Sequence, residues 1–332
     1  MSTLPYFAKV LPDGRWALYL DNHLISTFSE CEKKFYYRHM LMIQPKARSS
    51  AVSIGGWWAR VMEDFYGAFE SKSATQSFLL EQAMLRWREL SMDALENEDP
   101  TRFEKFGGLK GALLMCNEYF EKYAGEDTRR WRIISVELGF GLKNEVLLGE
   151  NNKVVVFYCG RPDKLIYDIV DNYVAPVDDK TVDAIPWNVH VKYKPFSQFA
   201  GYVFAVNKIV EDLGIADRKA DRCIVNVCGR LPAGKTREGK VKERFVRVYS
   251  PFSQADIDEW QINTLRKATR LRAACEADAF VMNEQACHLY SGCIYRMIDS
   301  QHVGQDRQRA IELGYVHVEP WKPYELQEET EK

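Results

Sequence analysis

The sequence lacks several features that define whole classes of protein. It contains no run of 18 apolar residues, so no membrane-spanning helix is expected. Its beginning, MSTLPYFAKV, lacks the apolar core of a signal peptide, and its eight cysteines form no small disulfide framework. The net charge of −2 argues against a strongly basic nucleic-acid coat protein but permits a local basic channel. We therefore expect a protein of the reducing cytoplasm.

The chain has ample material for a globular core, since 46% of its 332 residues are hydrophobic and 28% are charged. The apolar periodicity predicts helices first, then strands, then helices that alternate with strands. This order favours an α/β or α+β fold. The expected helices span residues 27–42 (capped by Ser26 or Thr27), 54–71, 76–96, 102–124, 196–213 and 253–275; the expected strands span 132–142, 153–158, 161–170, 173–179, 222–228 and 243–249.

Two neighbouring segments carry the most informative residues. Apolar residues alternate in GRPDKLIYDIV (160–170) and YVAPVDDKTVD (173–183), and the short polar link between them predicts a hairpin. The hairpin brings Asp163 close to Asp178 and Lys180, which are two residues apart and therefore point to one face. Two carboxylates and an ammonium on one patch are costly unless a cation joins them. Carboxylate oxygens suit Mg²⁺ or Mn²⁺, so the pattern predicts phosphodiester hydrolysis.

These residues resemble the PD-(D/E)XK nuclease superfamily, whose core is G-x-x-D, a hairpin and D-x-K-T, here Gly160–Asp163 and Asp178–Thr181. Further pieces are similar to its RecB-like branch, which includes CRISPR adaptation nucleases and phage exonucleases. The Q-x-x-x-Y of that branch matches Gln198 and Tyr202, and its first helix, S-x-S-x-x-x-C-x-x-x-F-x-Y, resembles residues 26–37. The pieces come in family order.

The resemblance covers about residues 24 to 300. It implies a restriction-endonuclease-like mixed central sheet flanked by helices, with a helical N-terminal insertion. It also implies one nuclease-like domain between an N-terminal arm and a C-terminal extension. The expected parts are the arm at 1–25, the domain at 26–300 (helical over 26–125, sheet core over 130–250, cysteine segment over 275–300) and the extension at 301–332.

The function that the resemblance implies is that of a metal-dependent DNA nuclease. It would be an exonuclease on single-stranded DNA or frayed duplex ends, in phage or mobile-element recombination, repair or replication, with other proteins of those processes as possible partners. Asp163 and Asp178 would bind Mg²⁺ or Mn²⁺ together with the Asp179 carbonyl. Glu137, in ISVELGF, is either a further acid near the metal or a solvated strand residue.

The remaining catalytic roles follow from the same resemblance. Lys180 would polarise or deprotonate the attacking water, while Gln198 and Tyr202, which share a helix face, would position the scissile strand. The branch usually has G-x-x-x-H, and Ala59 stands where that His is expected. An alternative is therefore a nuclease fold that grips DNA without cutting it, although the retained Asp178-x-Lys180 favours catalysis.

Three cysteines resemble the iron–sulfur ligands of the branch: Cys31, Cys287 and Cys293. Cluster ligation usually needs four thiolates, and the expected fourth cysteine is missing. The alternative is a remnant whose cysteines pack the C-terminal segment against the first helix. Other residues that could supply a fourth ligand are Asp299, His288 and Cys275.

GRLPAGKT, residues 229–236, matches the P-loop pattern G-x-x-x-x-G-K-T. A phosphate cradle needs Lys-Thr to open a helix, but the following REGKVKERFVRVY predicts a strand. A P-loop ATPase is therefore disfavoured, and we expect a basic hairpin tip that contacts the DNA backbone. Its DNA-binding residues would be Lys235, Arg237, Lys240 and Lys242.

The adjacent Trp57 and Trp58 admit two interpretations. One of them could be a platform on which unpaired bases stack. Because adjacent residues cannot share one helix face, at most one of the two would meet DNA. The favoured interpretation is that one indole lies in the core and the other covers it.

Overall fold

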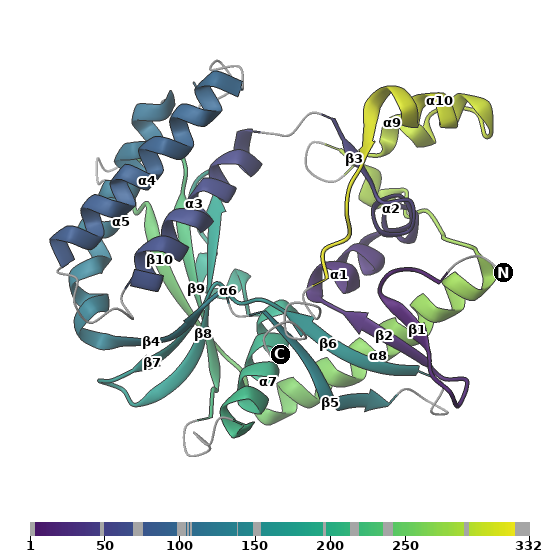
Figure 1. Ribbon diagram of the computed structural model, residues 1–332, viewed down its shortest axis with the longest axis horizontal. Helices are drawn as coiled ribbons and strands as arrows, with labels where there is room; N and C mark the ends of the chain where they lie inside the picture. The colour runs from purple at the N-terminus through teal and green to yellow at the C-terminus, as the bar shows by residue number, and fades with distance from the viewer. Residues whose placement is uncertain are drawn as a thin grey trace. The chain divides into compact units, whose positions relative to one another are not determined.

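The structure is a computed structural model that describes residues 4–46, 50–68, 76–97, 104, 106, 108–137, 139–148, 154–194, 197–212, 219–234, 242–288 and 292–322. It divides into two compact units, which share no sheet among the described residues (Figure 1). The first unit comprises Met1–Arg48, Gly139–Gly160 and Ala255–Lys332; the second comprises Ser49–Leu138 and Arg161–Gln254. The mixed sheets and helices confirm the predicted α/β class. None of the described helices is both long and apolar enough to cross a bilayer.

The second unit is built on a five-stranded mixed sheet, in the order β10-β9-β8-β7-β4. Neighbouring strands are antiparallel except β8 and β9, which are parallel and are joined through a helical crossover. The central strand β8 is buried from Tyr173 to Asp178, as expected for a strand covered on both faces. The strands are β4 (Trp131–Val136), β7 (Lys164–Asp168), β8 (Tyr173–Val182), β9 (Arg222–Gly229) and β10 (Phe245–Pro251).

Helices cover this sheet and form the unit's core with it. α3 packs on β4 and β8, α5 packs on β4, and α7 packs on β8 and β9. Trp57 and Trp58 are 9% and 1% exposed and lie in this core, so the packing interpretation is confirmed and the stacking interpretation is wrong. The helices are α3 (Ser50–Gly67), α4 (Gln76–Asn97), α5 (Gly108–Arg130), α6 (Val189–Lys192) and α7 (Ser197–Asp212).

The first unit joins segments from both ends of the chain. Its four-stranded sheet has the order β1-β2-β6-β5, and α8 packs on it through Trp260, whose ring centroid is 4.9 Å from that of Tyr158. A second, two-stranded sheet pairs β3 with β11. The elements are β1 (Ala8–Val10), β2 (Trp16–Leu20), α1 (Asn22–Glu30), α2 (Glu32–Phe35), a π-helical turn (Tyr36–Met40), β3 (Ile43–Pro45), β5 (Phe140–Leu148), β6 (Val154–Gly160), α8 (Gln254–Ala277), a 3₁₀ turn (Gln285–His288), α9 (Arg296–Asp299), α10 (Gln305–Gly314) and β11 (Tyr315–His317).

Two predicted elements are divided in the structure. The helix expected over 27–42 begins at Asn22, because the buried Asp21 carboxylate caps it by accepting the Leu24 N–H at 2.6 Å, and it is interrupted at the extended residue Cys31. The strand expected over 132–142 is interrupted at Glu137, whose φ of 51° breaks the extended backbone. β4 and β5 on either side of this break belong to different sheets.

Candidate active site

The predicted hairpin is formed by β7 and β8, which pair from Lys164 opposite Val177. This register places Asp163 just before β7, where its Oδ2 accepts the backbone N–H of Asp179 at 2.5 Å. On the face opposite to the Asp179 side chain, the Lys180 ammonium lies 2.6 Å from Asp178 Oδ2. Period-two alternation along β8 therefore determines which charged groups meet.

The helix α7 adds two polar side chains, one helical turn apart. The Gln198 amide donates to Asp178 Oδ1 and to the Tyr202 hydroxyl oxygen, both at 3.0 Å. The Tyr202 hydroxyl in turn donates to the carbonyl oxygen of Arg161 at 3.0 Å. Arg161 is two residues before Asp163 in the sequence. The structure thus brings Gln198 to Asp178 directly and Tyr202 to the backbone that precedes Asp163.

The two carboxylates of this site carry unfavourable negative charge. Burial raises the pKa of Asp163 well above its usual value, and the charges of Asp178 and Asp179 raise it further. Burial also raises the pKa of Asp178, although Lys180 acts in the opposite direction. Burial would lower the pKa of Lys180, but the Asp178 and Asp163 charges outweigh it and the pKa is raised. The site favours an additional positive charge.

Asp179 directs its side chain to the opposite face of the sheet. There its carboxylate forms a buried ion pair with Lys164 and accepts a 2.6 Å hydrogen bond from Asn226 on β9. Lys164 is 1% exposed, and its ammonium lies 4.4 Å from the centroid of the Tyr66 ring. The Asp179 carboxylate is therefore held away from Asp178.

Glu137 lies beside Asp163 through the backbone, since its N–H donates to the Asp163 carbonyl oxygen at 3.0 Å. Its carboxylate forms an ion pair with Arg161 at 2.7 Å. Burial raises the Glu137 pKa, while Arg161 lowers it and Glu63 raises it. Glu137 is thus a partly buried acid next to the hairpin and is charge-paired rather than simply solvated.

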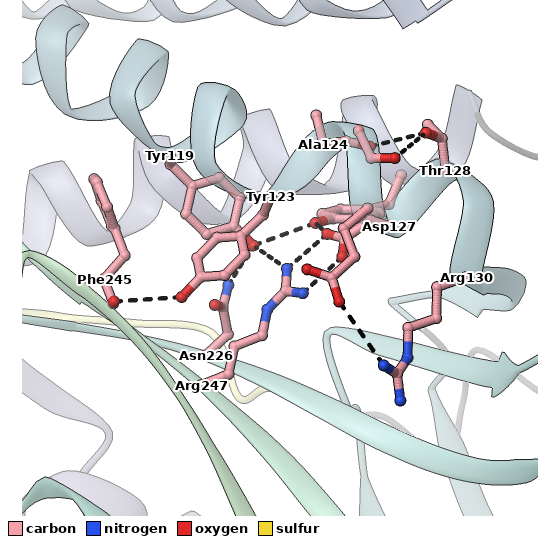
Figure 2. A network of polar contacts seen from close by, with 12 residues as sticks. Tyr119, Tyr123, Ala124, Asp127, Thr128, Arg130, Asn226, Phe245 and Arg247 are labelled. Carbon is pink, nitrogen blue, oxygen red and sulfur yellow. Dashed lines mark hydrogen bonds and ion pairs between the residues drawn. The ribbon is translucent and has the colours of Figure 1, made fainter. Parts of the chain in front are cut away.

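A buried polar network between α5 and the strands β9 and β10 was not predicted from the sequence (Figure 2). Asp127 on α5 accepts two hydrogen bonds of 2.6 Å from the Arg247 guanidinium on β10 and one of 2.6 Å from the Tyr66 hydroxyl. Tyr119 accepts from Asn226 at 2.6 Å and lies 3.2 Å from the Tyr66 hydroxyl oxygen. The network continues through Asn226 to Asp179. Asn226 is a polar residue among the apolar residues of β9, and this is the feature of the sequence that could have indicated the network.

The three cysteines of the predicted cluster are linked by hydrogen bonds through one loop of the first unit. Cys31 Sγ accepts the backbone N–H groups of Lys34 at 3.5 Å and of Asn283 at 3.4 Å. The Cys287 thiol donates to the Asn283 carbonyl at 3.7 Å, and the Cys293 N–H donates to the Cys287 carbonyl at 3.1 Å. Burial raises the pKa of Cys287, and Cys293 and Cys31 raise it further. Burial also raises the pKa of Cys293, although the Tyr295 backbone and Lys34 lower it in part.

The candidate fourth ligands differ in their surroundings. Asp299 is near enough for its charge to raise the pKa of Cys287 and Cys293, but it accepts a 2.7 Å hydrogen bond from Tyr37. Cys275 is affected by other neighbours, since burial, Asp278 and Glu276 raise its pKa to about 12. Within the described ranges, no three His, Cys, Asp or Glu side chains converge as a ready-made metal cluster.

The predicted DNA-binding tip falls largely outside the described residues, which exclude Lys235, Arg237 and Lys240. Lys242 is exposed, and its N–H donates to the Gly234 carbonyl at 2.8 Å. The Gly229 N–H donates to the Arg244 carbonyl at 2.7 Å, and β10 follows directly. The described residues on either side of the tip, at the end of β9 and just before β10, are therefore paired as in a hairpin.

The family of the chain follows from its match to the model of the PD-(D/E)XK nuclease superfamily, which extends over residues 24–298. The chain belongs to this superfamily, and the predicted membership is confirmed. A membership of this kind defines the fold and the expected location of the site.

Two solved structures are similar at low identity. A protein from Eubacterium rectale described as a candidate exonuclease shares 14% identity, with a TM-score of 0.42, over 86% of this chain and 90% of that chain. LHK-Exo, solved in complex with dAMP, shares 13% identity, with a TM-score of 0.20, over 67% of this chain and 95% of that chain. No curated protein matches the sequence. The family match alone carries the assignment.

Proposed function

We propose that this protein is a metal-dependent DNA nuclease of the RecB-like branch. It acts as an exonuclease on single-stranded DNA or frayed ends, in recombination, repair or phage replication in the cytoplasm. The observation that carries the proposal is the convergence of Asp163, Asp178 and Lys180 on one hairpin face, with Gln198 bonded to Asp178. Membership of a nuclease superfamily supports the same chemistry.

The donor set fits a hard divalent cation. Asp163 and Asp178 have raised pKa values because they are buried near other carboxylates, and an added cation relieves this repulsion. Mg²⁺ is commonly bound through one or two carboxylates, with water completing its coordination. Asp163 and Asp178 would hold Mg²⁺ or Mn²⁺ with the Asp179 carbonyl, and Glu137 is a further acid at the edge of the site. A bound cation supplies a Lewis acid and lowers the pKa of water.

The protein's own groups then orient the reactants. Lys180, 2.6 Å from Asp178, orients the attacking water and stabilises negative charge on the phosphate. Gln198 holds Asp178 in place through its amide, and Tyr202 holds Gln198 while bonding to the Arg161 carbonyl. Gln198 and Tyr202 thereby fix the position of the scissile strand relative to the Asp178 carboxylate.

A second cofactor is proposed for the first unit, namely an iron–sulfur cluster on Cys31, Cys287 and Cys293. It is supported by the contacts of Cys31 and Cys287 with Asn283 and by the backbone hydrogen bond from Cys293 to Cys287. Asp299 is the best-placed candidate for the fourth ligand, because it is close enough for its charge to raise the pKa of both Cys287 and Cys293. The role of such a cluster is structural, since it would tie the first helices to the C-terminal segment.

The test is cleavage of end-labelled single-stranded and double-stranded DNA with Mn²⁺, comparing the wild type with Asp178→Ala and Asp163→Ala. Each variant removes a carboxylate that the cation needs, so cleavage should be abolished while circular dichroism stays unchanged. Lys219→Ala, at an exposed position of the same unit, should cleave normally. Undiminished cleavage by the Asp178 variant would overturn the assignment.

A second candidate is a DNA-binding protein that does not cut. It is favoured by Ala59, which stands where the branch usually has a His. Ala59 lies one helical turn after Gly55. At Gly55, α3 is so close to Thr181 that an added Cβ would lie 3.2 Å from the Thr181 hydroxyl oxygen. A wild type that binds DNA but cleaves neither substrate with Mn²⁺ or Mg²⁺ would support this candidate.

A further inference from the structure

The side chain of Trp187 is 96% exposed, which makes it the most exposed large hydrophobic residue in the described part of the chain. In the sequence it follows β8 and precedes α6 and α7, so it belongs to the segment that connects the strand of Asp178 to the helix of Gln198. An indole in water contributes almost none of the burial energy that stabilises a fold. Its position is therefore not explained by packing, in contrast to the buried Trp57 and Trp58.

The backbone around Trp187 is ordered by a tight turn. The Val189 N–H donates to the Pro186 carbonyl at 3.1 Å, and the Lys192 N–H donates to the Asn188 carbonyl at 3.0 Å. Val189 is 4% exposed and anchors the segment in the second unit, where α6 packs against β10. Trp187 is thus presented by a fixed turn, which lowers the entropy lost when a ligand contacts its ring.

The same segment reaches the candidate active site through Tyr193. Tyr193 is 4% exposed, and its ring centroid is 6.1 Å from that of Phe199 on α7. The Lys180 ammonium lies 5.9 Å from the centroid of the Phe199 ring. Burial raises the pKa of Tyr193, while the nearby charge of Lys180 lowers it and that of Asp178 raises it, in agreement with the position of Tyr193 beside Phe199.

The charge of the segment is of one sign. Residues 184–194 contain no Asp or Glu, and they include His190, Lys192 and Lys194. Lys194 and His190 are exposed, while Lys192 lies 5.4 Å from the centroid of the Tyr193 ring. Asp183, just before the segment, is paired with Arg230 at 2.6 Å. This segment therefore combines an exposed aromatic ring, which can stack on a base, with positively charged side chains, which can contact the neighbouring phosphates.

We infer that Trp187 is a stacking platform for an unpaired nucleobase of the substrate strand, with Lys192 and Lys194 contacting the adjacent phosphates. The inference rests on the proposed nuclease function and specifies its substrate as a strand with at least one unpaired base near the site. Stacking on an aromatic face is tolerant of sequence, because every base has such a face. The platform therefore confers a preference for single strands and frayed ends, and not for a base sequence.

Binding is tested first, with a short single-stranded oligonucleotide that carries 2-aminopurine and with protein carrying Asp178→Asn so that nothing is cleaved. Saturable quenching of 2-aminopurine is expected with Trp187 present. Trp187→Ala should raise Kd by about 5- to 100-fold and abolish the quenching. Trp187→Phe should retain most of the affinity, whereas Trp187→Leu, which keeps apolar bulk without a ring, should not.

Matched controls come from the same unit. Val170, 68% exposed at the turn end of the β7–β8 hairpin, should tolerate Val170→Ala without a change in Kd. Lys192→Ala and Lys194→Ala should each reduce the slope of log K against log salt by about 0.7, the value per phosphate contact for single strands. Lys219→Ala should leave this slope unchanged.

Cleavage then separates this inference from the proposed function. In the active protein with Mn²⁺, Trp187→Ala should raise KM on single strands with little change in kcat, and should have less effect on blunt duplexes. If the wild type cleaves but Trp187→Ala binds and cleaves single strands normally, the platform is wrong and the nuclease stands. If the wild type never cleaves but the Trp187-dependent quenching persists, the platform stands and the nuclease proposal fails. Equal affinity of the Leu and Phe variants for the oligonucleotide would overturn the stacking platform, because apolar bulk without an aromatic ring would then suffice.

Discussion

The charged residues on the two faces of β8 have different partners. On one face Asp179 has a full counter-charge from Lys164 and a hydrogen bond from Asn226. On the other face Lys180 pairs with Asp178 and lies near Asp163, whose pKa is raised well above normal by burial and by the neighbouring carboxylates. The first arrangement stabilises the fold, and the second favours binding of a cation.

At the residue scale, Lys180→Ala should slow the chemical step while sparing the metal. Removing an ammonium that orients water or stabilises phosphate charge should lower kcat by about 10²- to 10⁴-fold. Calorimetry should show that Mn²⁺ still binds, because both carboxylates remain. Lys208→Ala, a lysine on α7 that pairs at 3.9 Å with Glu211, is the control and should retain full kcat. A Lys180→Ala enzyme with normal kcat would remove Lys180 from the mechanism.

At the scale of elements, the ion pair of Asp127 and Arg247 joins α5 to β10. Asp127 is fully buried, and the side chain of Arg247 is 8% exposed. Asp127→Ala leaves the guanidinium buried without its partner, which should lower the free energy of unfolding by about 3–5 kcal/mol in urea titrations. The Asp127→Leu/Arg247→Met pair, which removes both charges, should recover much of this loss.

The control for this pair is Glu121→Ala on the same helix. Glu121 accepts an exposed hydrogen bond from Asn117, so its loss should change the free energy of unfolding by less than about 0.5 kcal/mol. If Asp127→Ala lowered the free energy of unfolding as little as Glu121→Ala, the ion pair would not be what holds α5 to β10.

A second element-scale prediction concerns the π-helical turn of the first unit and its buried His39. His39 is 6% exposed, and burial, with the charges of His23 and Arg38, lowers its pKa to about 3. The unfolded state binds a proton below about pH 6.5 while the folded state does not, so stability is lost as pH falls from there towards 3. This loss amounts to about 1.4 kcal/mol per pH unit for one proton.

His39→Gln should therefore make the acid loss of stability shallower, measured as the urea dependence of circular dichroism at pH 7 and pH 5. Asp21 acts with the opposite sign. Its buried carboxyl has a pKa of about 6, so the folded state keeps a proton that the unfolded state releases, and stability falls as pH rises through that range. Asp21→Asn should therefore steepen the loss at acid pH. Identical pH slopes for wild type and His39→Gln would contradict the assignment of a neutral buried His39.

At the scale of the whole molecule, the first unit closes a very long stretch of chain. Cys31 and Cys287 are more than 250 residues apart in sequence, yet both contact Asn283. The Asn283 amide also donates to the Glu30 carbonyl at 2.9 Å, and Arg270 pairs with Glu32 at 2.9 Å. Closing so long a loop is entropically costly, and metal binding would offset that cost.

Protein purified without oxygen should then be brown and contain iron. Cys31→Ala and Cys293→Ala should bleach it and expose the C-terminal segment to proteolysis, because each removes a ligand. Cys116→Ala, at a buried position of the second unit, should keep the colour. Colourless protein with neither iron nor zinc would show that the cysteines only pack. The nuclease proposal would survive, since its cation site lies on the hairpin.

The sequence by itself determined the parts of this protein that follow local periodicity. Alternation over two residues predicted the hairpin and the shared face of Asp178 and Lys180, and the four-residue spacing of Gln198 and Tyr202 predicted one helix face. These patterns depend only on backbone geometry, so they need no knowledge of distant residues. The motifs in family order were enough to predict the superfamily.

Only the tertiary structure decided which charged groups share a buried environment and which aromatic residues stay in water. The joining of Asp127 to Arg247 and of Asn226 to Asp179 depends on how α5, β8, β9 and β10 pack. Trp57 is buried in the core of the second unit, whereas Trp187 is exposed. Burial and charge pairing are sums over contacts between segments far apart in sequence, and such sums are defined only once the chain has folded.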